Sequence, residues 1–418
     1  MRLLIATDAF PPVCGGSGWS TYELAKGLRA RGHEIAIVQP RLRPAAAPAF
    51  DGFEPIAFPY SAPPVPFVRN FVKNERLYPR FAAFLRDVIR RRQIEIVHAQ
   101  HLLTGPAGIA AARAAGVPAV CTVRDYWPVC YWSDLIVDRD ADTLCPACTP
   151  GRMTRCVRPH AGAWWPVAIP AIPYMRSNLA LKRRALADAD AVVAVSGAMA
   201  RDLRARAPEL AGTRLEVIPN PVDVEALRAQ AAGSAAPVPG AYALFVGKLE
   251  PNKGVRWLLP AIERARLQWP LVVVGDGSGR AALEAEAAAA GREVTFTGWL
   301  SRAEVLAWMQ RASLLVFPSH GPESLSRVLL EASALGVPIA AMETGGTADI
   351  VVHEETGLLA RSPEELGDQV ARLAGDPDLR ARFGGAARQH VERTFDSGAV
   401  VARIERLYLE LAAARRGV

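Results

Sequence analysis

The chain has 418 residues, more than one hydrophobic core usually spans, and this length predicts two domains. Half of the residues are hydrophobic and 22% are charged, a composition that excludes an intrinsically disordered chain. The formal net charge of +7 favours anionic partners. Because no recognition motif or dense basic run accompanies that charge, we expect nucleotide phosphates or an anionic membrane surface as partners, and no nucleic acid.

The apolar stretches of the chain are short. The first, Leu3 to Ala6, is soon followed by Asp8 and is too short for the core of a signal peptide. The longest, Ala163 to Met175, contains three prolines and is shorter than the roughly 20 residues that a spanning helix needs. We therefore expect a cytoplasmic protein without a transmembrane segment.

The first half of the chain alternates predicted strands with helical patterns. A strand over Arg2 to Thr7 is followed by a glycine-rich turn at residues 15–18 and by a helix to Arg31. Further strands are predicted over residues 34–39, 94–98, 118–123, 191–195 and 215–218. This alternation predicts a doubly wound parallel sheet.

A second unit of the same kind follows a segment rich in Ala, Pro and Gly, residues 219–239, which we interpret as a linker. Its predicted strands cover residues 242–246, 271–274, 294–297, 314–317 and 338–341. The predicted class is therefore α/β, with two Rossmann-like domains that face a central cleft. We place the domains at residues 1–219, with an insert at about 128–160, and 220–395, and expect the helix at 396–418 to pack back on the first domain.

Two loops at predicted strand ends are candidates for binding an anion, because ligands of open parallel sheets sit at the carboxyl ends of the strands. Gly15 and Gly16 open the first helix, where missing side chains let a phosphate or sugar approach the backbone. Lys248 and Lys253, two of only five lysines, lie in the loop that starts at Gly247 and could neutralise a diphosphate. A plain tight turn and a solvated charged turn remain the alternatives.

A third glycine-rich loop contains Gly275 and Gly277. Its spacing is not G-x-G-x-x-G, and no acidic residue ends a strand about 20 residues later. The loop therefore gives little support to a hydride-transfer enzyme.

Glu323 and Glu331 flank the predicted start of an amphipathic helix in the second unit. The free N–H groups of Leu325, Ser326 and Arg327 would point at an anion there, assisted by the helix dipole. A carboxylate on each side could bind neutral hydroxyls, one on a sugar and one on a ribose, through charge-assisted hydrogen bonds.

This segment resembles the signature E-x7-E of the retaining glycosyltransferases of family four (group 1), which have the GT-B fold. The likeness extends over nearly the whole chain. It includes Gly15-Gly16, Arg31-Gly32-His33-Glu34, Ile96-Val97-His98, Val195-Ser196, Ile218-Pro219-Asn220, Gly247-Lys248-Leu249, Lys253-Gly254, Gly275-Asp276-Gly277, Gly345-Gly346 and Thr356-Gly357-Leu358-Leu359.

The resemblance implies roles for these residues. Glu323 would contact the donor sugar near the reacting carbon, Glu331 the ribose, and Lys248 and Lys253 the diphosphate of a UDP- or GDP-linked sugar. In this family the leaving diphosphate is thought to accept the proton of the acceptor on the face of attack, so no separate base and no catalytic cofactor is implied. The acceptor would be a glycan or a lipid-linked molecule, in cell-surface polysaccharide or glycolipid synthesis. The remaining donor-side candidates are Gly15, Gly16, Gly247, Gly275, Gly277, Leu325 and Ser326.

The sequence departs from the family pattern at three positions. Arg124-Asp125 replaces the His-Asp that follows the predicted strand ending at Val123, Lys248 replaces an arginine, and Ser326 replaces a glycine. We assign His98, Arg124 and Asp125 to the sugar or acceptor side of the cleft. A non-catalytic nucleotide-sugar or membrane-surface binding protein, or another GT-B enzyme such as a sugar-nucleotide epimerase, is the alternative.

The insert carries four clustered cysteines, Cys130, Cys145, Cys148 and Cys156. In a cytoplasmic protein this cluster favours a structural zinc site, with free or redox-active thiols and disulfides as alternatives. Asp138-Arg139-Asp140 matches the metal-binding D-x-D of the other glycosyltransferase fold, but so short a motif matches by chance.

Aromatic residues interleave with prolines from Trp164 to Tyr174, and basic residues follow from Arg176 to Arg184. This pattern resembles an interfacial patch and predicts peripheral contact with the inner face of the cell membrane. A buried interdomain connection is the alternative.

Overall fold

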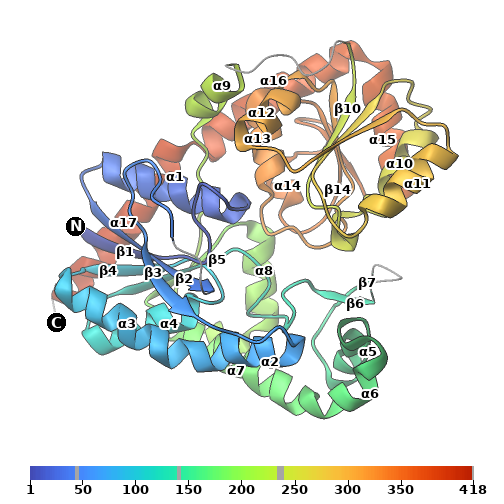
Figure 1. The fold of residues 1–418 in the computed structure, drawn as a ribbon. Coiled ribbons are helices and arrows are strands. Elements are labelled where there is room, and N and C mark those ends of the chain that lie inside the picture. Colours follow the sequence, from blue (N-terminus) through green and yellow to red (C-terminus); the bar gives the residue numbers. More distant parts are fainter. Residues whose placement is uncertain (43–46, 139–142, 233–239, 417–418) are drawn as a thin grey trace.

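The computed structural model describes residues 1–42, 47–138, 143–232 and 240–416. Within these ranges the chain forms two parallel α/β domains, with a small helical insert at the edge of the first (Figure 1). None of the described helices is long and apolar enough to span a lipid bilayer. The predicted class, two parallel-sheet domains, is confirmed.

The described part of the N-terminal domain is built on a parallel sheet in the order β3-β2-β1-β4-β5-β8-β9. These strands are β1 (Arg2–Ala6), β2 (Glu34–Leu42), β3 (Ile56–Tyr60), β4 (Ile96–Ala99), β5 (Ala119–Val123), β8 (Ala191–Ala194) and β9 (Leu215–Val217). The central strands are buried on both faces, so they are apolar along their whole length. Helices cover both faces: α1 (Gly16–Ala30) packs on one, and α3 (Leu77–Arg91), α4 (Gly105–Ala115) and α8 (Gly197–Arg206) pack on the other.

The C-terminal domain repeats this plan with a sheet in the order β12-β11-β10-β13-β14-β15 among the described residues. Its strands are β10 (Ala243–Val246), β11 (Leu271–Val274), β12 (Val294–Gly298), β13 (Leu314–Phe317), β14 (Ile339–Met342) and β15 (Leu358–Ala360). One face packs against α9 (Val224–Ala232), α12 (Arg302–Arg311), α13 (Arg327–Leu335) and α16 (Pro377–Thr394). The other packs against α10 (Val255–Arg264), α11 (Arg280–Ala289) and α15 (Pro363–Gly375).

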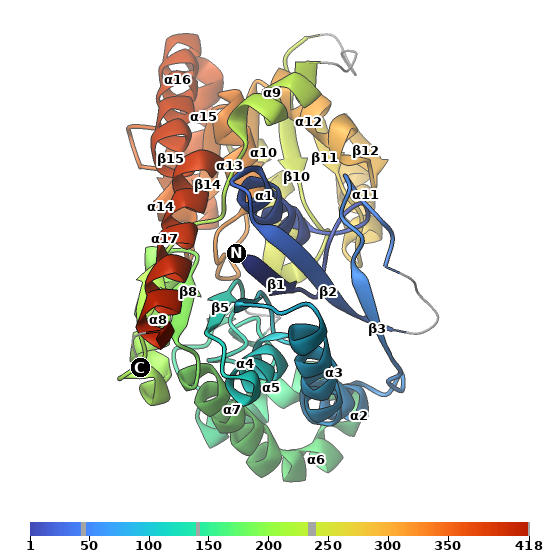
Figure 2. The same ribbon diagram turned by 90° about the vertical axis from the view of Figure 1, so that its left-hand side faces the viewer.

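The last helix, α17 (Ser397–Arg416), leaves the C-terminal domain and lies along the N-terminal sheet, as Figure 2 shows. Its apolar residues Val400, Ile404 and Tyr408 share a core with Leu3 and Ile5 of β1. The two crossing segments are also bonded to each other, because the Val222 amide donates to the Phe395 carbonyl at 2.9 Å. The domains are therefore joined by two chain segments that run side by side.

The insert folds mainly into helices rather than into an irregular loop. It contains the short antiparallel pair β6 (Ile136–Asp138) and β7 (Thr143–Leu144), followed by α5 (Pro150–Ala161), α6 (Trp165–Ala168) and α7 (Ile172–Ala187). Helix α2 (Pro66–Phe71) lies next to it, since the ring of Phe71 contacts that of Tyr174 with centroids 5.9 Å apart. Arg139 and Asp140 of the D-x-D match lie outside the described residues.

Candidate active site

A cavity of about 600 Å³ lies where the two domains meet. The N-terminal domain lines it with residues 12–20, which follow β1 and open α1, and with Arg124 after β5. The C-terminal domain lines it with Lys253, with residues 299–302 before α12, and with residues 323–328 and Glu331 around the start of α13. Both walls therefore come from the carboxyl ends of parallel strands, where ligands of such sheets bind.

Glu323 and Lys253 form an ion pair in this cavity. The Lys253 Nζ lies 2.5 Å from Glu323 Oε1, and the Ser319 hydroxyl donates to the same oxygen at 2.6 Å. The Glu323 side chain is only 11% exposed, and its carbonyl accepts from the Gly346 amide at 2.6 Å. The carboxylate is thus held by both its backbone and its side chain, with its position fixed before any ligand arrives.

Glu331 belongs to a buried network of charges that joins the two domains. Its Oε1 accepts from Arg327 Nε at 3.0 Å and from Arg302 Nη1 at 2.7 Å. The other end of the Arg327 guanidinium donates to Glu23 of α1 and, at 2.9 Å, to the Pro221 carbonyl. Burial lowers the pKa of Arg327, but the carboxylates of Glu23 and Glu331 more than offset this, and the net change is upward.

The glycine at the start of α1 makes this contact between the domains possible. A Cβ atom at Gly16 would lie 2.8 Å from Arg327 Cβ, closer than real contacts of this kind. Gly16 and Arg327 therefore meet across the cavity only because the glycine has no side chain.

Arg124, one of the three residues that depart from the family pattern, lies in the wall of the cavity and is nearly buried. Its Nε and Nη2 donate to Gln100 Oε1 at 3.1 and 2.6 Å. Its Nη1 is buried without a hydrogen-bond partner among the described residues. Burial, and then the charge of Arg327, lower the pKa of Arg124 to about 9. The hydrogen-bonding capacity of Nη1 is thus unused within the described part of the chain.

The structure brings most of the predicted donor-side residues into one cavity. Those that line it are Gly15, Gly16, Lys253, Glu323, Leu325, Ser326 and Glu331, and Arg124, predicted on the sugar or acceptor side, lines it as well. Asp125 lines an adjoining pocket on the N-terminal domain.

Other predicted residues lie elsewhere. His98 is buried in β4, where its ring nitrogens bond Tyr408 of α17 at 2.5 Å and Thr122 at 2.6 Å, so it joins α17 to the sheet instead of facing the cleft. Lys248 is exposed, and it is not among the described residues that line the cavity. Gly247, Gly275 and Gly277 are also not among the described residues that line the cavity.

Gly275 has a structural reason to be glycine. Its φ is +135°, and a Cβ atom there would lie 1.9 Å from the carbonyl oxygen of Gly247. The loop after β11 therefore packs directly on the loop after β10, and the glycine supports the segment that leads to Lys253 without lining the cavity itself.

The four clustered cysteines line one very small cavity of about 20 Å³ in the insert. Their thiols point to different acceptors: Cys145 Sγ donates to the Ala147 carbonyl and Cys156 Sγ to the Met153 carbonyl, each at 3.3 Å. The described residues contain no group of three or more His, Cys, Asp or Glu side chains placed to hold a metal ion. Burial also raises the pKa of Cys130 and Cys156 to about 12, so that without a bound cation both thiols stay protonated at neutral pH. None of the four cysteines forms a disulfide, and the zinc site stays a prediction.

Sequence reasoning missed the residues that surround Glu331. Arg302, stacked over the Trp19 ring at 4.4 Å, and Glu23 belong to helices far apart in the sequence, so only the fold brings them together. Arg327 could have been found, because it lies four residues before Glu331 and so on the same helix face.

Two family models match this chain. Residues 14–226 match the family model described as Glycosyltransferase Family 4, and residues 240–376 match that described as Glycosyl transferases group 1. The chain is 27% identical to the glycogen synthase of Mycobacterium tuberculosis, covering 100% of this chain and 96% of that one. It is 26% identical to the D-inositol 3-phosphate glycosyltransferase of Xylanimonas cellulosilytica, covering 90% and 87% of the two chains.

Solved structures share the fold at lower identity. Sucrose-phosphate synthase from Thermosynechococcus elongatus superposes with a TM-score of 0.75 at 20% identity and covers 99% of this chain and 100% of that one. Anabaena HepE in complex with UDP-glucose superposes with a TM-score of 0.65 at 18% identity, covering 98% and 100%.

Proposed function

The chain belongs to glycosyltransferase family 4, and on that premise we propose that it is a retaining, metal-independent enzyme that transfers a sugar from a UDP- or GDP-linked donor to a glycan or lipid-linked acceptor. The observation that carries this proposal is the convergence, in one cavity, of the Lys253–Glu323 pair and the start of α1. A cation, a carboxylate and a glycine-opened helix end are what a nucleoside diphosphate sugar requires.

Each wall of the cavity has a separate role in this proposal. In the free protein the ammonium group of Lys253 pairs with Glu323. When the donor binds, its diphosphate replaces Glu323 as the partner of Lys253, and the lysine neutralises the charge of the diphosphate. Glu323 then accepts hydrogen bonds from hydroxyls of the donor sugar. Glu331, whose Oε1 is held by two arginines, presents its carboxylate to the ribose. The unpartnered Nη1 of Arg124 donates to the donor from the opposite domain.

The chemistry follows from this arrangement. An acceptor hydroxyl attacks the anomeric carbon on the face from which the diphosphate departs. One carbon–oxygen bond forms as the bond to the diphosphate breaks, and an oxygen of the leaving diphosphate takes the hydroxyl proton. The positive charge of Lys253 and Arg124 stabilises the charge that grows on the leaving group, and the meeting of two domains limits access of water to the donor.

Purified protein and a panel of nucleotide sugars test the proposal. A thermal-shift screen identifies the donor, since a ligand at about 100 times its Kd stabilises by about 2.7 kcal/mol. Release of nucleoside diphosphate is then measured with membrane extract as the source of acceptor, and NMR gives the anomeric configuration of the product. If the protein binds the donor but releases no nucleoside diphosphate with any acceptor, the transferase proposal fails and the protein is a non-catalytic nucleotide-sugar binding protein. Conversion of the donor sugar without transfer would leave an epimerase, and an inverted product would refute the retaining mechanism.

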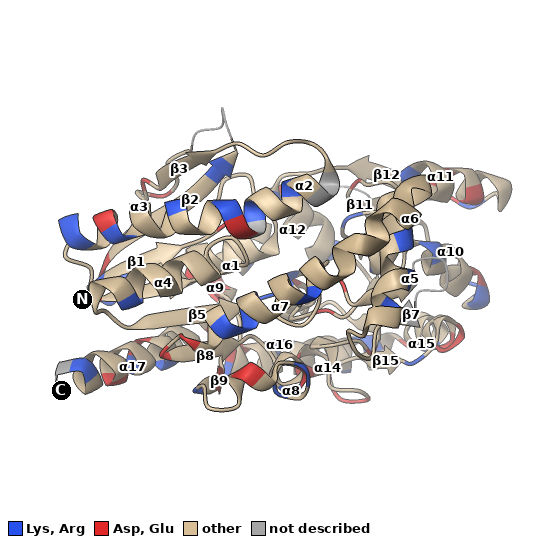
Figure 3. Cartoon of the chain, turned by 90° about the horizontal axis from the view of Figure 1, so that it is seen from below, with Lys and Arg blue, Asp and Glu red and all other residues tan. Residues whose placement is uncertain are grey.

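We also propose that the insert contacts an anionic membrane surface. Trp164 and Val167 around α6 are 76% and 72% exposed, and Val65 and Val68 of the neighbouring α2 are exposed as well. Exposed arginines lie on the same face: Arg69 on α2, Arg155 and Arg158 on α5, and Arg176 and Arg184 on α7. Figure 3 looks at this face, where Lys and Arg lie along α2 and α7. Apolar residues surrounded by arginine suit the boundary between lipid headgroups and acyl chains.

A further inference from the structure

A second pocket of about 480 Å³ is lined by residues of the N-terminal domain and its insert. Two chain segments contribute to both spaces. After β5, Arg124 lines the cavity and Asp125 lines the second pocket. After β1, Asp8 lines the second pocket and Pro12 lines the cavity. Arg124 and Asp125 are adjacent in the sequence, and Asp8 and Pro12 are four residues apart, so a molecule in the second pocket would lie near the donor.

The charges of the second pocket differ from those of the cavity. Three carboxylates line it, Asp8, Asp125 and Asp134, against the single ammonium group of Lys73. Asp8 accepts from the Leu103 amide at 3.2 Å with Oδ2, while its Oδ1 is buried without a hydrogen-bond partner among the described residues.

Nearby groups and burial both affect the charge of the aspartates that line the second pocket. Lys182 of α7 is fully buried near Asp125 and raises the fraction of that carboxyl group that is ionised. Burial nevertheless raises the pKa of Asp8 to about 7 and that of Asp125 to about 6, so both groups can accept or donate a hydrogen bond near neutral pH.

The opposite wall of this pocket is aromatic and comes from the insert. The rings of Trp132 and His160 stack with centroids 3.9 Å apart, and Tyr131 meets Trp132 edge to face at 4.9 Å. All three line the pocket. A sugar or polyol presents hydroxyl groups and C–H groups. The carboxylates on one wall can bind the hydroxyls, and the aromatic rings on the opposite wall can pack on the C–H groups.

We propose that this second pocket is the acceptor subsite, and that it takes an uncharged, hydroxyl-rich sugar or polyol end while it rejects a phosphorylated one. The proposal rests on the transferase function proposed above. The selectivity follows from charge, because a phosphate would be repelled by the carboxylates of Asp125 and Asp134, and by that of Asp8 once it ionises near pH 7, while Lys73 supplies the one ammonium group among the described lining residues. The insert thereby gains a role, since it supplies the aromatic wall that selects the acceptor.

The test compares matched acceptors with the donor found by the thermal-shift screen. Methyl α-glucoside, methyl α-mannoside and myo-inositol are paired with glucose 6-phosphate, mannose 6-phosphate and inositol 1-phosphate, and the rate of nucleoside diphosphate release is measured for each. We expect each neutral compound to exceed its phosphorylated partner in kcat/KM by at least about tenfold. Equal or better use of the phosphorylated compounds would overturn the proposal.

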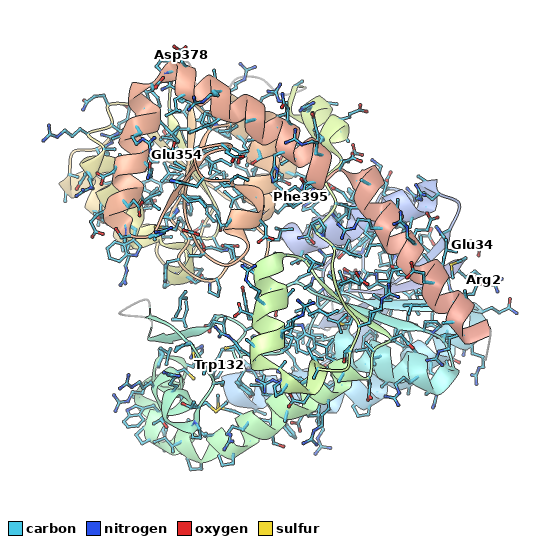
Figure 4. All side chains as sticks on the ribbon, turned by 180° about the vertical axis from the view of Figure 1, so that it is seen from behind. Arg2, Glu34, Trp132, Glu354, Asp378 and Phe395 are labelled. Atoms are coloured by element: carbon cyan, nitrogen blue, oxygen red, sulfur yellow. The ribbon has the colours of Figure 1, made fainter. Side chains whose placement is uncertain are left out.

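Variants of the aromatic wall separate acceptor binding from donor binding. Trp132→Ala is expected to raise the acceptor KM by about tenfold and to change the donor Kd, measured by calorimetry, by less than about twofold. Trp132→Phe should restore most of the affinity, because it keeps an aromatic face. Asp378→Asn is the control: Figure 4 shows Asp378 at the far end of the C-terminal domain from Trp132. An unchanged acceptor KM in Trp132→Ala would refute the assignment.

A binding measurement keeps this inference distinct from the proposed function. Saturation-transfer NMR detects the neutral acceptors on the protein with nucleoside diphosphate present, and needs no turnover. If the wild type releases no nucleoside diphosphate but binds these acceptors and Trp132→Ala does not, the transferase proposal fails and the subsite stands. If neither protein binds them, or both bind equally, the subsite is refuted.

Discussion

The interdomain cavity and the pocket beside it have opposite charge although the same two loops line both. The cavity contains Lys253 and three arginines, Arg124, Arg302 and Arg327, against the carboxylates of Glu323 and Glu331. The pocket contains three aspartates and one lysine. The change of sign between Arg124 and Asp125, adjacent in the sequence, separates a space suited to a diphosphate from a space suited to hydroxyls.

The two sites also differ in how they are built. The cavity has walls from both domains, and its charges are tied together by the Glu23–Arg327–Glu331 network. The pocket is built by the N-terminal domain and its insert alone. Changes in the cavity should therefore affect domain association and donor binding together, whereas changes in the pocket should affect the acceptor.

The largest expected effect is that of Arg327→Met. The substitution removes the guanidinium and leaves buried Glu23 and Glu331 with Arg302 as their one shared partner among the described residues, and breaking a buried pair costs about 3–5 kcal/mol. Chemical denaturation should show this loss, and calorimetry should show weaker donor binding. Arg264→Met breaks an exposed pair with Asp368 and should leave both measurements near those of the wild type. Unchanged stability in Arg327→Met would show that the network does not hold the domains together.

Glu323→Gln should act on the reaction and Glu331→Gln on binding. The first keeps the shape of a side chain that contacts the reacting sugar but removes its charge, and we expect turnover to fall about 10²–10³-fold with a small change in donor Kd. The second should mainly raise the donor Kd, because the ribose loses a charged partner. Single-turnover kinetics and calorimetry distinguish the two, and the reverse pattern would exchange the roles given to the glutamates.

Asp8→Asn should stabilise the protein in a way that depends on pH. Burial raises the pKa of Asp8 from 3.8 to about 7, so between these values the folded chain holds a proton that the unfolded chain releases. The stability of the wild type therefore falls as pH rises through this window, by on the order of 2 kcal/mol once partial exposure is allowed for.

The asparagine variant lacks this loss. It should exceed the wild type in Tm at pH 8, and the difference should vanish near pH 4. Asp378→Asn, on the exposed first turn of α16, should show no such change between the two pH values. A variant less stable than the wild type at pH 8 would mean that ionised Asp8 is well solvated or paired.

Much of the fold could be predicted because the central strands are short apolar runs buried on both faces. Two described edge strands were missed for physical reasons: β3 contains Pro59, which a central strand would not tolerate, and β15 has only three residues. Part of the predicted linker forms the helix α9 over Val224–Ala232. The enrichment in Ala, Pro and Gly suggests a linker, but alanine also favours helix. Residues 233–239 of the predicted linker lie outside the described part.

The candidate site could be predicted only in part. Glu323 and Lys253 follow strand ends, so topology alone brings them to one edge. His98 also lies near a strand end, but strand alternation turns its side chain to the face that α17 covers, a direction that depends on packing with the last helix. Lys248 illustrates the limit: two lysines in one loop point to different sides, and only the one after the turn reaches the cavity.

The smallest expected effect is that of substitutions on the surface of the insert. They should weaken binding to lipid vesicles and should leave the cavity and the second pocket unchanged. Arg176→Gln removes one exposed cation, worth about 1 kcal/mol at an anionic surface, so partitioning onto vesicles that contain phosphatidylglycerol should fall about fivefold. Arg406→Gln, exposed on α17 away from the insert, controls for net charge. Trp164→Ser should weaken binding to neutral phosphatidylcholine vesicles as well, because it removes an apolar contact and no charge. Equal losses in Arg176→Gln and Arg406→Gln would mean that overall charge, and not this face, attracts the protein to lipid.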